Sequence, residues 1–201
     1  MTNTSSNLSN YRPKIGLLGG TFNPPHNGHL KISKKAKLIL QLDEIWWIIA
    51  LQNPLKSFHE SSTFESRYFK AKKFLDKEKK IIAKPIELEL NNQFSYHTIN
   101  YLINRYNNYK FVWIMGADNL IQIQDWKYWH EIFESIPIAI FNRPNYSYRS
   151  LSSIASKFYA KYRLKGHPKL LSIIEPPIWT FIWNSHENQS ATEIRKLRQK
   201  N

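Results

Sequence analysis

Two histidines separated by a short glycine-containing spacer, His26-Asn27-Gly28-His29, are the residues whose types and spacing most directly suggest chemistry. They follow the run Gly19-Gly20-Thr21-Phe22-Asn23-Pro24-Pro25. Imidazoles in such a position can donate hydrogen bonds to phosphate oxygens and stabilise the charge that develops in a transition state. The glycine between them lets a ligand approach the backbone closely. The segment therefore predicts a phosphate-binding site.

The elements on either side of this segment favour the same interpretation. Ile15–Leu18 is a short apolar run that Gly19-Gly20 ends, as expected of a buried strand, and a helical pattern begins at Leu30. A strand, a glycine-bearing turn and a helix bring backbone N–H groups and a helix N-terminus to one point, where phosphate is stabilised. The spacing matches neither common glycine-rich phosphate loop. A surface loop with two incidental histidines, or half of a metal site, is the alternative.

Polar residues also follow two other predicted strands. Glu44–Ala50 leads into a polar loop that contains Lys56, and Phe111–Met115 ends at a glycine that Asp118 follows. If these strands run parallel to the first, their ends share one edge of the sheet. We therefore expect Lys56 to approach the phosphates and the Asp118 carboxylate to accept hydrogen bonds from a ribose diol.

The remaining periodicity predicts alternating strands and helices, which indicates a doubly wound α/β domain with a mostly parallel sheet. The predicted strands are Ile15–Leu18, Glu44–Ala50, Lys80–Ala83, Ile86–Leu90, Phe111–Met115, Ile136–Phe141 and Ile178–Ile182. The predicted helices are the segment from Leu30 onward, Phe64–Leu75, Ser95–Tyr106, Asp125–Phe133 and Ser150–Arg163.

Several side chains on these elements have two interpretations. Ser62 and Glu65 have the spacing of a capping box, and Arg67 is either an anion ligand or a surface residue. Trp126 either presents its face to a flat ring or packs in the core. The alternation of Ile86–Leu90 predicts that its glutamates are solvated.

A second predicted anion site closes the sequence. Ser190 and Glu193 have capping-box spacing, with Thr192 and Arg195 beside them. Hydroxyls and N–H groups at a helix N-terminus next to an arginine suit a triphosphate. The alternative is an ordinary capped helix with a surface arginine.

Composition sets the class of protein. The chain has 201 residues, which we divide into a disordered tail (1–12) and one domain (13–201). Its net charge of +14 indicates an anionic partner without distinguishing a nucleotide from a nucleic acid.

The absence of cysteine excludes a disulfide framework and thiolate metal sites and fits a reducing compartment. No signal peptide or run of the ~20 apolar residues of a membrane span is present, so we expect a cytoplasmic protein.

Taken together, the motifs resemble bacterial nicotinate-mononucleotide adenylyltransferases of the HxGH nucleotidyltransferase superfamily. The likeness runs from about Lys14 to Arg195. It rests on the Gly19–Pro24 run with His26-x-Gly28-His29, on Asn53-Pro54-Leu55-Lys56, on Gly116-Ala117-Asp118-Asn119-Leu120, on Trp126 with Trp129, on Arg143-Pro144, and on Ser190-x-Thr192-x-x-Arg195.

The resemblance implies transfer of an adenylyl group from ATP to nicotinate mononucleotide, with Mg²⁺ bound to the ATP and no covalent enzyme intermediate. It implies catalytic roles for His26, His29, Lys56 and Arg195. It implies ATP binding by Gly19, Gly20, Thr21, Phe22, Gly28, Gly116, Asp118, Arg143, Ser190 and Thr192, and mononucleotide binding by Asn23, Tyr96, His97 and Trp126. It implies no resident metal site and no nucleic-acid or membrane partner, and leaves the oligomeric state open.

The sequence departs from the family pattern at three places. Asn23 replaces the usual aspartate, Ala191 stands where a second serine is common, and His97 interrupts the usual Ser-Tyr-Thr. The pyridine end of the site is therefore the part least determined by the motifs. The alternatives are another small-molecule adenylyltransferase, acting on phosphopantetheine or nicotinamide mononucleotide, and a basic nucleic-acid-binding module.

Overall fold

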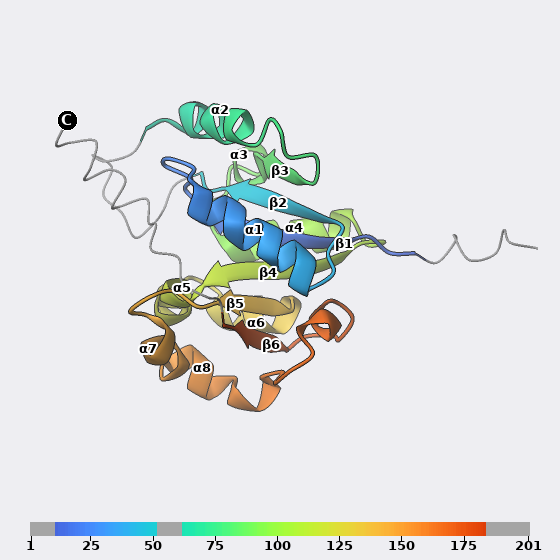
Figure 1. Ribbon diagram of the computed structural model, residues 1–201, viewed down its shortest axis with the longest axis vertical. Helices are drawn as coiled ribbons and strands as arrows, with labels where there is room; N and C mark the ends of the chain where they lie inside the picture. The colour runs from blue at the N-terminus through green and yellow to red at the C-terminus, as the bar shows by residue number, and fades with distance from the viewer. Residues whose placement is uncertain (1–10, 52–61, 184–201) are drawn as a thin grey trace, which may run out of the picture.

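A computed structural model describes residues 11–51 and 62–183 of the chain (Figure 1). Its centre is a six-stranded sheet in the order β3-β2-β1-β4-β5-β6, in which every neighbouring pair is parallel. The strands are β1 (Lys14–Gly20), β2 (Glu44–Ile49), β3 (Ile81–Lys84), β4 (Lys110–Gly116), β5 (Ile138–Phe141) and β6 (Trp179–Ile182). The predicted doubly wound α/β fold is confirmed, with a sheet that is parallel throughout.

The direction in which successive strands are added reverses at the middle of the sheet, between β1 and β4. From β1 the chain moves outward through β2 and β3 and then returns to β4 on the other side of β1. The loops that follow β1 and β4 therefore leave in opposite directions. Ligands of open α/β sheets bind at such a switch point, outside the carboxyl ends of the strands, so we expect a ligand site at the loops after Gly20 and Gly116.

Helices cover both faces of this sheet. They are α1 (Asn27–Ile39), α2 (Phe64–Phe74), α3 (Ile86–Glu89), α4 (Ser95–Arg105), α5 (Ala117–Gln122), α6 (Trp129–Ser135), α7 (Ser147–Leu151) and α8 (Ile154–Phe158), with short 3-10 helices η2 (Ile123–Asp125), η3 (Ala160–Tyr162) and η4 (Pro168–Ser172). In Figure 1, α1 lies across one face of the sheet and α4 lies behind it.

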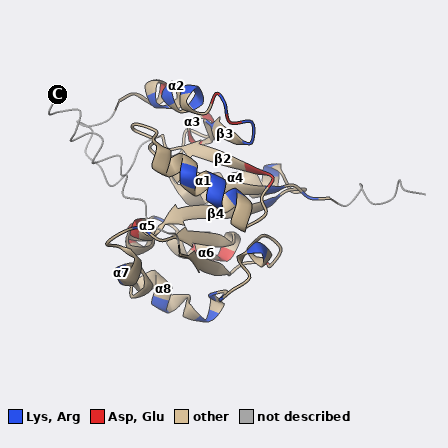
Figure 2. Ribbon diagram, viewed as in Figure 1, with Lys and Arg blue, Asp and Glu red and all other residues tan. Residues whose placement is uncertain are grey.

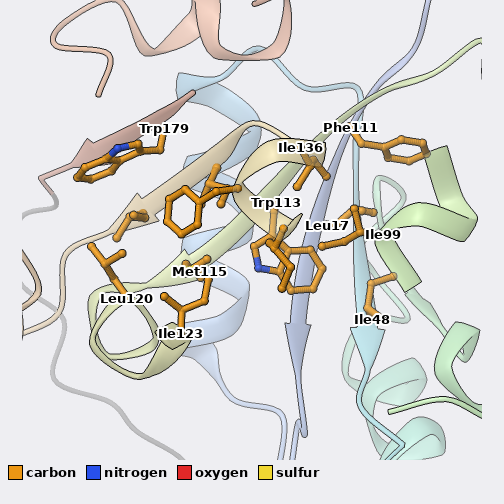
Figure 3. Close-up of a cluster of buried hydrophobic side chains, with 14 of the residues drawn as sticks. Leu17, Ile48, Ile99, Phe111, Trp113, Met115, Leu120, Ile123, Ile136 and Trp179 are labelled. Carbon is orange, nitrogen blue, oxygen red and sulfur yellow. The ribbon is translucent and has the colours of Figure 1, made fainter. Parts of the chain in front are cut away.

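Two hydrophobic cores follow from the alternation of side chains along buried strands. Trp46 packs into one core with Trp113 and Trp179, whereas its neighbour Trp47 packs into the other with Ile114. Figure 3 shows the first core, with Trp113 near its centre. Strands buried on both faces are nearly continuous apolar runs, which is why periodicity located them correctly.

The predicted strand Ile86–Leu90 is wrong, because this segment forms the helix α3. Pro85 precedes it, and the backbone turns at once. Ile86 and Glu87 are both buried, while Leu88 is 43% exposed. The alternating sequence therefore does not correspond to alternating faces, and the prediction that its glutamates are solvated fails for Glu87.

Three further predictions about helices needed correction. The predicted helix Asp125–Phe133 is interrupted at Tyr128, whose φ of 63° is left-handed, so α6 starts only at the next residue. The predicted helix Ser150–Arg163 is divided among α7, α8 and η3. The cap of α2 is Thr63, whose side chain accepts a hydrogen bond from the Ser66 N–H at 3.3 Å, rather than Ser62.

The lysine and arginine residues are distributed over several elements, including α1, α2 and α8 (Figure 2). Lysines on the outer faces of amphipathic helices account for much of the net charge of +14. Within the described residues, no helix is both long and apolar enough to cross a membrane.

Candidate active site

The two predicted catalytic histidines lie together where α1 begins. His26 is the residue before the helix, and its backbone N–H donates to Nδ1 of His29 at 3.3 Å. The two rings are stacked with their centroids 3.7 Å apart. The His-x-x-His spacing thus closes the first turn of α1 and fixes both imidazoles at the positive end of the helix.

A buried aromatic residue, Phe22, packs against His29 of this pair. The Phe22 ring is 1% exposed and lies 4.7 Å from the His29 ring and 4.5 Å from the Trp47 ring. Its φ of 46° is unusual for a residue with a side chain, and the surrounding packing holds it there. Because the Phe22 side chain is in the core, only its backbone remains available for the ATP contact that the sequence predicted.

Both imidazoles are neutral near neutral pH. Burial, with help from the positive charge of Arg143, lowers the pKa of His26 to about 4. Burial also lowers the pKa of His29 well below its usual value, and His26 and Arg143 act in the same direction. Each neutral ring can donate one hydrogen bond to a phosphate oxygen, and an arriving phosphate would favour its protonation.

A second part of the site lies where β4 and β5 end. Arg143 Nη1 donates to Asp118 Oδ2 at 2.8 Å, and the other carboxylate oxygen, Oδ1, is buried with no described hydrogen-bond partner. Gly116 allows this arrangement, because a Cβ atom there would run into Asp118 Oδ1 and Arg143 Nε. A buried acceptor held in place by an arginine suits a ligand hydroxyl.

A cavity, named the Trp126 cavity after one of its lining residues, adjoins the loop after β1. The residues that line it are Gly19, Gly20, Thr21, Ala50, Glu87, Gln93, Phe94, Ser95, Trp113, Asn119, Gln122, Asp125, Trp126 and Lys127. Trp126 is half-buried, with one part against the core and one part in the cavity wall. At Gly19 a Cβ atom would lie 2.7 Å from Cη2 of Trp113, so only glycine fits without a shift of the indole.

The structure does not bring every predicted mononucleotide ligand to this cavity. The Asn23 side-chain oxygen instead accepts a hydrogen bond from the Ser62 hydroxyl at 2.9 Å. Tyr96 and His97 pack against Tyr128, with ring centroids 5.4 Å and 5.1 Å away. Neither is among the lining residues, although their neighbour Ser95 is.

The remaining predicted residues lie at the cavity, in α1 or outside the described residues. Gly19, Gly20, Thr21 and Trp126 line the cavity, and Gly28 is buried in the first turn of α1. Lys56, Ser190, Thr192 and Arg195 lie outside the described residues.

Sequence reasoning did not predict the burial of two ionisable residues near the cavity. Glu87 is 4% exposed and lines the cavity, and burial raises its pKa to about 8. Arg67, also 4% exposed, hydrogen bonds to backbone carbonyls, so it occupies neither the surface nor the anion-ligand position that the sequence suggested. No sequence signal identified Glu87, because its alternating neighbours indicated a solvated face.

Comparison with known proteins places the chain in a family. The family model described as cytidylyltransferase-like matches residues 17–197. Curated proteins named "probable nicotinate-nucleotide adenylyltransferase" are similar over nearly the whole chain. The one from Parvibaculum lavamentivorans is 36% identical over 91% of this chain and 91% of its own length. The chain belongs to the nicotinate-nucleotide adenylyltransferase family.

Another member of the family, from Ruegeria sp. (strain TM1040), is 37% identical over 90% of this chain and 96% of its own length. Among solved structures, Plasmodium falciparum nicotinic acid mononucleotide adenylyltransferase complexed with NaAD matches with a TM-score of 0.69. That match covers 92% of this chain and 83% of the other, at 19% identity. At this identity the solved structure supports only the fold, whereas the more similar curated relatives show the family membership.

Proposed function

We propose that this protein transfers the adenylyl group of ATP to nicotinate mononucleotide and releases pyrophosphate, a step of NAD biosynthesis. The main support is that a cavity, a histidine pair and the Arg143–Asp118 pair lie together at the switch point of the sheet. The segment Gly19–His29 lines the Trp126 cavity at one end and carries the two histidines at the other. Arg143 pairs with Asp118, and its positive charge lowers the pKa of both histidines.

The proposed reaction is a direct displacement at the α-phosphorus of ATP. An oxygen of the mononucleotide 5′-phosphate forms a bond to that phosphorus, and the bond to the bridging oxygen between the α- and β-phosphates breaks, so that pyrophosphate leaves with the electron pair. The attacking oxygen carries no proton near neutral pH, because the second phosphate pKa is about 6. The protein therefore has to position and stabilise charge rather than supply a nucleophile or base.

His26 and His29 are proposed to donate hydrogen bonds to the phosphate oxygens. Their low pKa values keep them neutral in the free protein. As negative charge builds on the leaving phosphates, a charged imidazole becomes more favourable, so the stabilisation grows toward the transition state. Their fixed place at the start of α1 means that little reorganisation is needed.

Asp118 is proposed to accept a hydrogen bond from the adenosine ribose, because its Oδ1 is buried with no described partner while its Oδ2 accepts from Arg143. Trp126 is proposed to stack on the pyridine ring, since it lines the cavity and is half-buried. We further propose that Lys56, Ser190, Thr192 and Arg195 hold the triphosphate, as their motifs suggest, and that ATP enters as its magnesium complex. Bound Mg²⁺ would neutralise part of the phosphate charge.

The test is an assay of ATP-dependent pyrophosphate release with nicotinate mononucleotide, nicotinamide mononucleotide and phosphopantetheine in parallel. We expect turnover with nicotinate mononucleotide and at least about a tenfold preference over the amide in kcat/KM, which corresponds to about 1.4 kcal/mol. The net charge of +14 favours the carboxylate of the acid over the neutral amide. Turnover of phosphopantetheine alone would contradict the proposed function, whereas equal use of the two mononucleotides would contradict only the selectivity.

A further inference from the structure

Arg67, on the first turns of α2, reaches into the core and binds four backbone carbonyl groups. Its Nε donates to Ser62 O at 3.2 Å, and its Nη2 donates to Leu51 O at 2.9 Å. Its Nη1 donates to both Thr21 O at 3.0 Å and Ala50 O at 2.7 Å. One guanidinium group therefore joins the loop after β1, the end of β2 and the chain that leads into α2.

Two further hydrogen bonds tie the same segments together. Ala50 N–H donates to Gly20 O at 2.9 Å, continuing the pairing of β1 with β2. The Ser62 hydroxyl donates to the Asn23 side-chain oxygen at 2.9 Å. The end of β1 and the loop after it are thus held by hydrogen bonds at Gly20, Thr21 and Asn23, and Arg67 supplies the bond at Thr21.

The Leu51 backbone is held on both sides by buried ionisable residues. Its N–H donates to Glu87 Oε2 at 2.8 Å, and its carbonyl accepts from Arg67. Burial lowers the pKa of Arg67, while the charges of Glu87 and Glu65 raise it. A guanidinium remains charged under these conditions because its pKa starts so high.

The chemistry of this contact requires an arginine. The guanidinium is a rigid planar fork whose donors point in several fixed directions, so it can serve carbonyls from separate segments at once. A lysine carries its three donors on one nitrogen and cannot span the same acceptors. Buried carbonyls that lose their donor are costly, so the backbone would move to find other partners.

We infer that Arg67 is a positioning residue for adenylyl transfer, which holds the loop after β1 in register with the end of β2. The inference rests on the proposed function. Thr21 and Ala50, two residues that Arg67 binds, line the Trp126 cavity, and His26 follows Thr21 within the same loop. Arg67 acts through these backbone groups, and a misplacement of about 1 Å at such a site can cost about 10²-fold in rate.

The experiment compares Arg67→Lys with Arg105→Lys, a matched control on the exposed face of α4. We expect Arg67→Lys to lower kcat/KM for the mononucleotide at least about tenfold after correction for the folded fraction, measured by circular dichroism, and Arg105→Lys to change it less than about threefold. In Arg67→Ala, added guanidinium ion should restore part of the activity, since it can occupy the vacated site. A residue that only stabilised the fold would show neither the corrected loss nor the rescue.

Hydrogen exchange provides a readout that does not depend on activity. Peptides that contain Thr21 and Leu51 should exchange faster in Arg67→Lys than in the parent, while peptides from β4 should not change. Unchanged exchange there, or a corrected kcat/KM within threefold of the parent, would overturn the inference. If the parent itself showed no transfer, the proposed function would fail, and the exchange result would still decide whether Arg67 positions the loop.

If Arg67→Lys does not fold under the assay conditions, both measurements are repeated at low temperature with trimethylamine N-oxide, which favours compact states. Selective loosening of the Thr21 and Leu51 peptides would then support the inference. A variant that stays unfolded even there would contradict it, because Arg67 would be a residue of global stability.

Discussion

The His26 and His29 rings are stacked 3.7 Å apart at the start of α1, and burial lowers the pKa of both. Two imidazolium ions at this distance would repel each other next to Arg143, so the free protein holds the pair uncharged. A bound polyphosphate, as in the proposed function, would supply the negative charge that makes protonation favourable. The pair is therefore suited to respond to phosphate charge rather than to carry a permanent positive charge.

His29→Ala should reduce turnover far more than it weakens ATP binding. A donor aimed at developing phosphate charge acts mainly in the transition state, and loss of such a donor usually costs about 10²- to 10³-fold in kcat. Steady-state kinetics at saturating substrates, with folding checked by circular dichroism, measures the effect. A kcat within threefold of the parent would remove His29 from the proposed mechanism.

Glu87→Gln should change how stability depends on pH. The folded-state pKa of Glu87, about 8, lies above its ordinary value of 4.5, so the folded protein binds the extra proton between these values. Its contribution to the free energy of unfolding is therefore present at low pH and is lost as pH rises from about 4.5 to about 8. Glutamine stays neutral, so the variant should gain at least about 1.4 kcal/mol relative to the parent between about pH 5 and pH 8.

The free energy of unfolding of the variant has to be compared with that of the parent at each pH, because His26 makes stability depend on pH in the opposite direction. Its lowered pKa makes stability fall as pH drops from about 6.5 to about 4. The control is Glu89→Gln, an exposed position on the same helix α3, which should show no such gain. A pH-independent difference for Glu87→Gln, from denaturant unfolding, would show that Glu87 is ionised in the folded state.

Trp126→Ala should raise the KM for nicotinate and nicotinamide mononucleotides by the same factor, at least about fivefold. Stacking on an aromatic face contributes about 0.5 to 1.5 kcal/mol beyond the buried area and does not depend on the substituent. The KM for ATP serves as the internal control and should change less than twofold. An increase confined to ATP would assign Trp126 to the adenine end of the site.

Gly116→Ala should weaken ATP binding while leaving mononucleotide binding nearly unchanged. The added Cβ runs into Asp118 and Arg143, so the pair must separate or shift. We expect the KM for ATP to rise at least about tenfold, since a positioned carboxylate-arginine pair is displaced as a unit.

Gly166→Ala is the matched control for this substitution. A Cβ atom at Gly166 meets nothing within 4 Å, but the φ of 71° disfavours alanine. The control should therefore lose about 1 kcal/mol of stability without a change in either KM. If Gly116→Ala behaved in the same way, Asp118 and Arg143 would have no part in ATP binding.

Local sequence patterns located all six strands of the described sheet, although they also predicted a strand at Ile86–Leu90 that is absent there, and they located the start of α1 at the two histidines. Buried parallel strands are continuous apolar runs, such as Phe111–Met115, and such runs are visible without any knowledge of their neighbours. The Gly19–His29 segment contains its own strand end, turn and helix start, so its residues are brought together by short-range geometry. The same holds for Asp118, which follows a strand end directly.

Tertiary structure alone decided the parts of the site that depend on contacts between distant segments. Arg67 is separated by 46 residues from Thr21 and by 16 from Leu51, and no local pattern distinguishes a buried arginine from a solvated one on a helix with several lysines. The sequence predicted that Glu87 lies on the solvated face of a strand, because the alternation of apolar and polar residues contains no information about the segments packed around it. Its burial results from its position between the end of β2 and the cavity. The partner of Asn23 was likewise not predictable, because Ser62, which donates to its side-chain oxygen, is 39 residues away in the sequence.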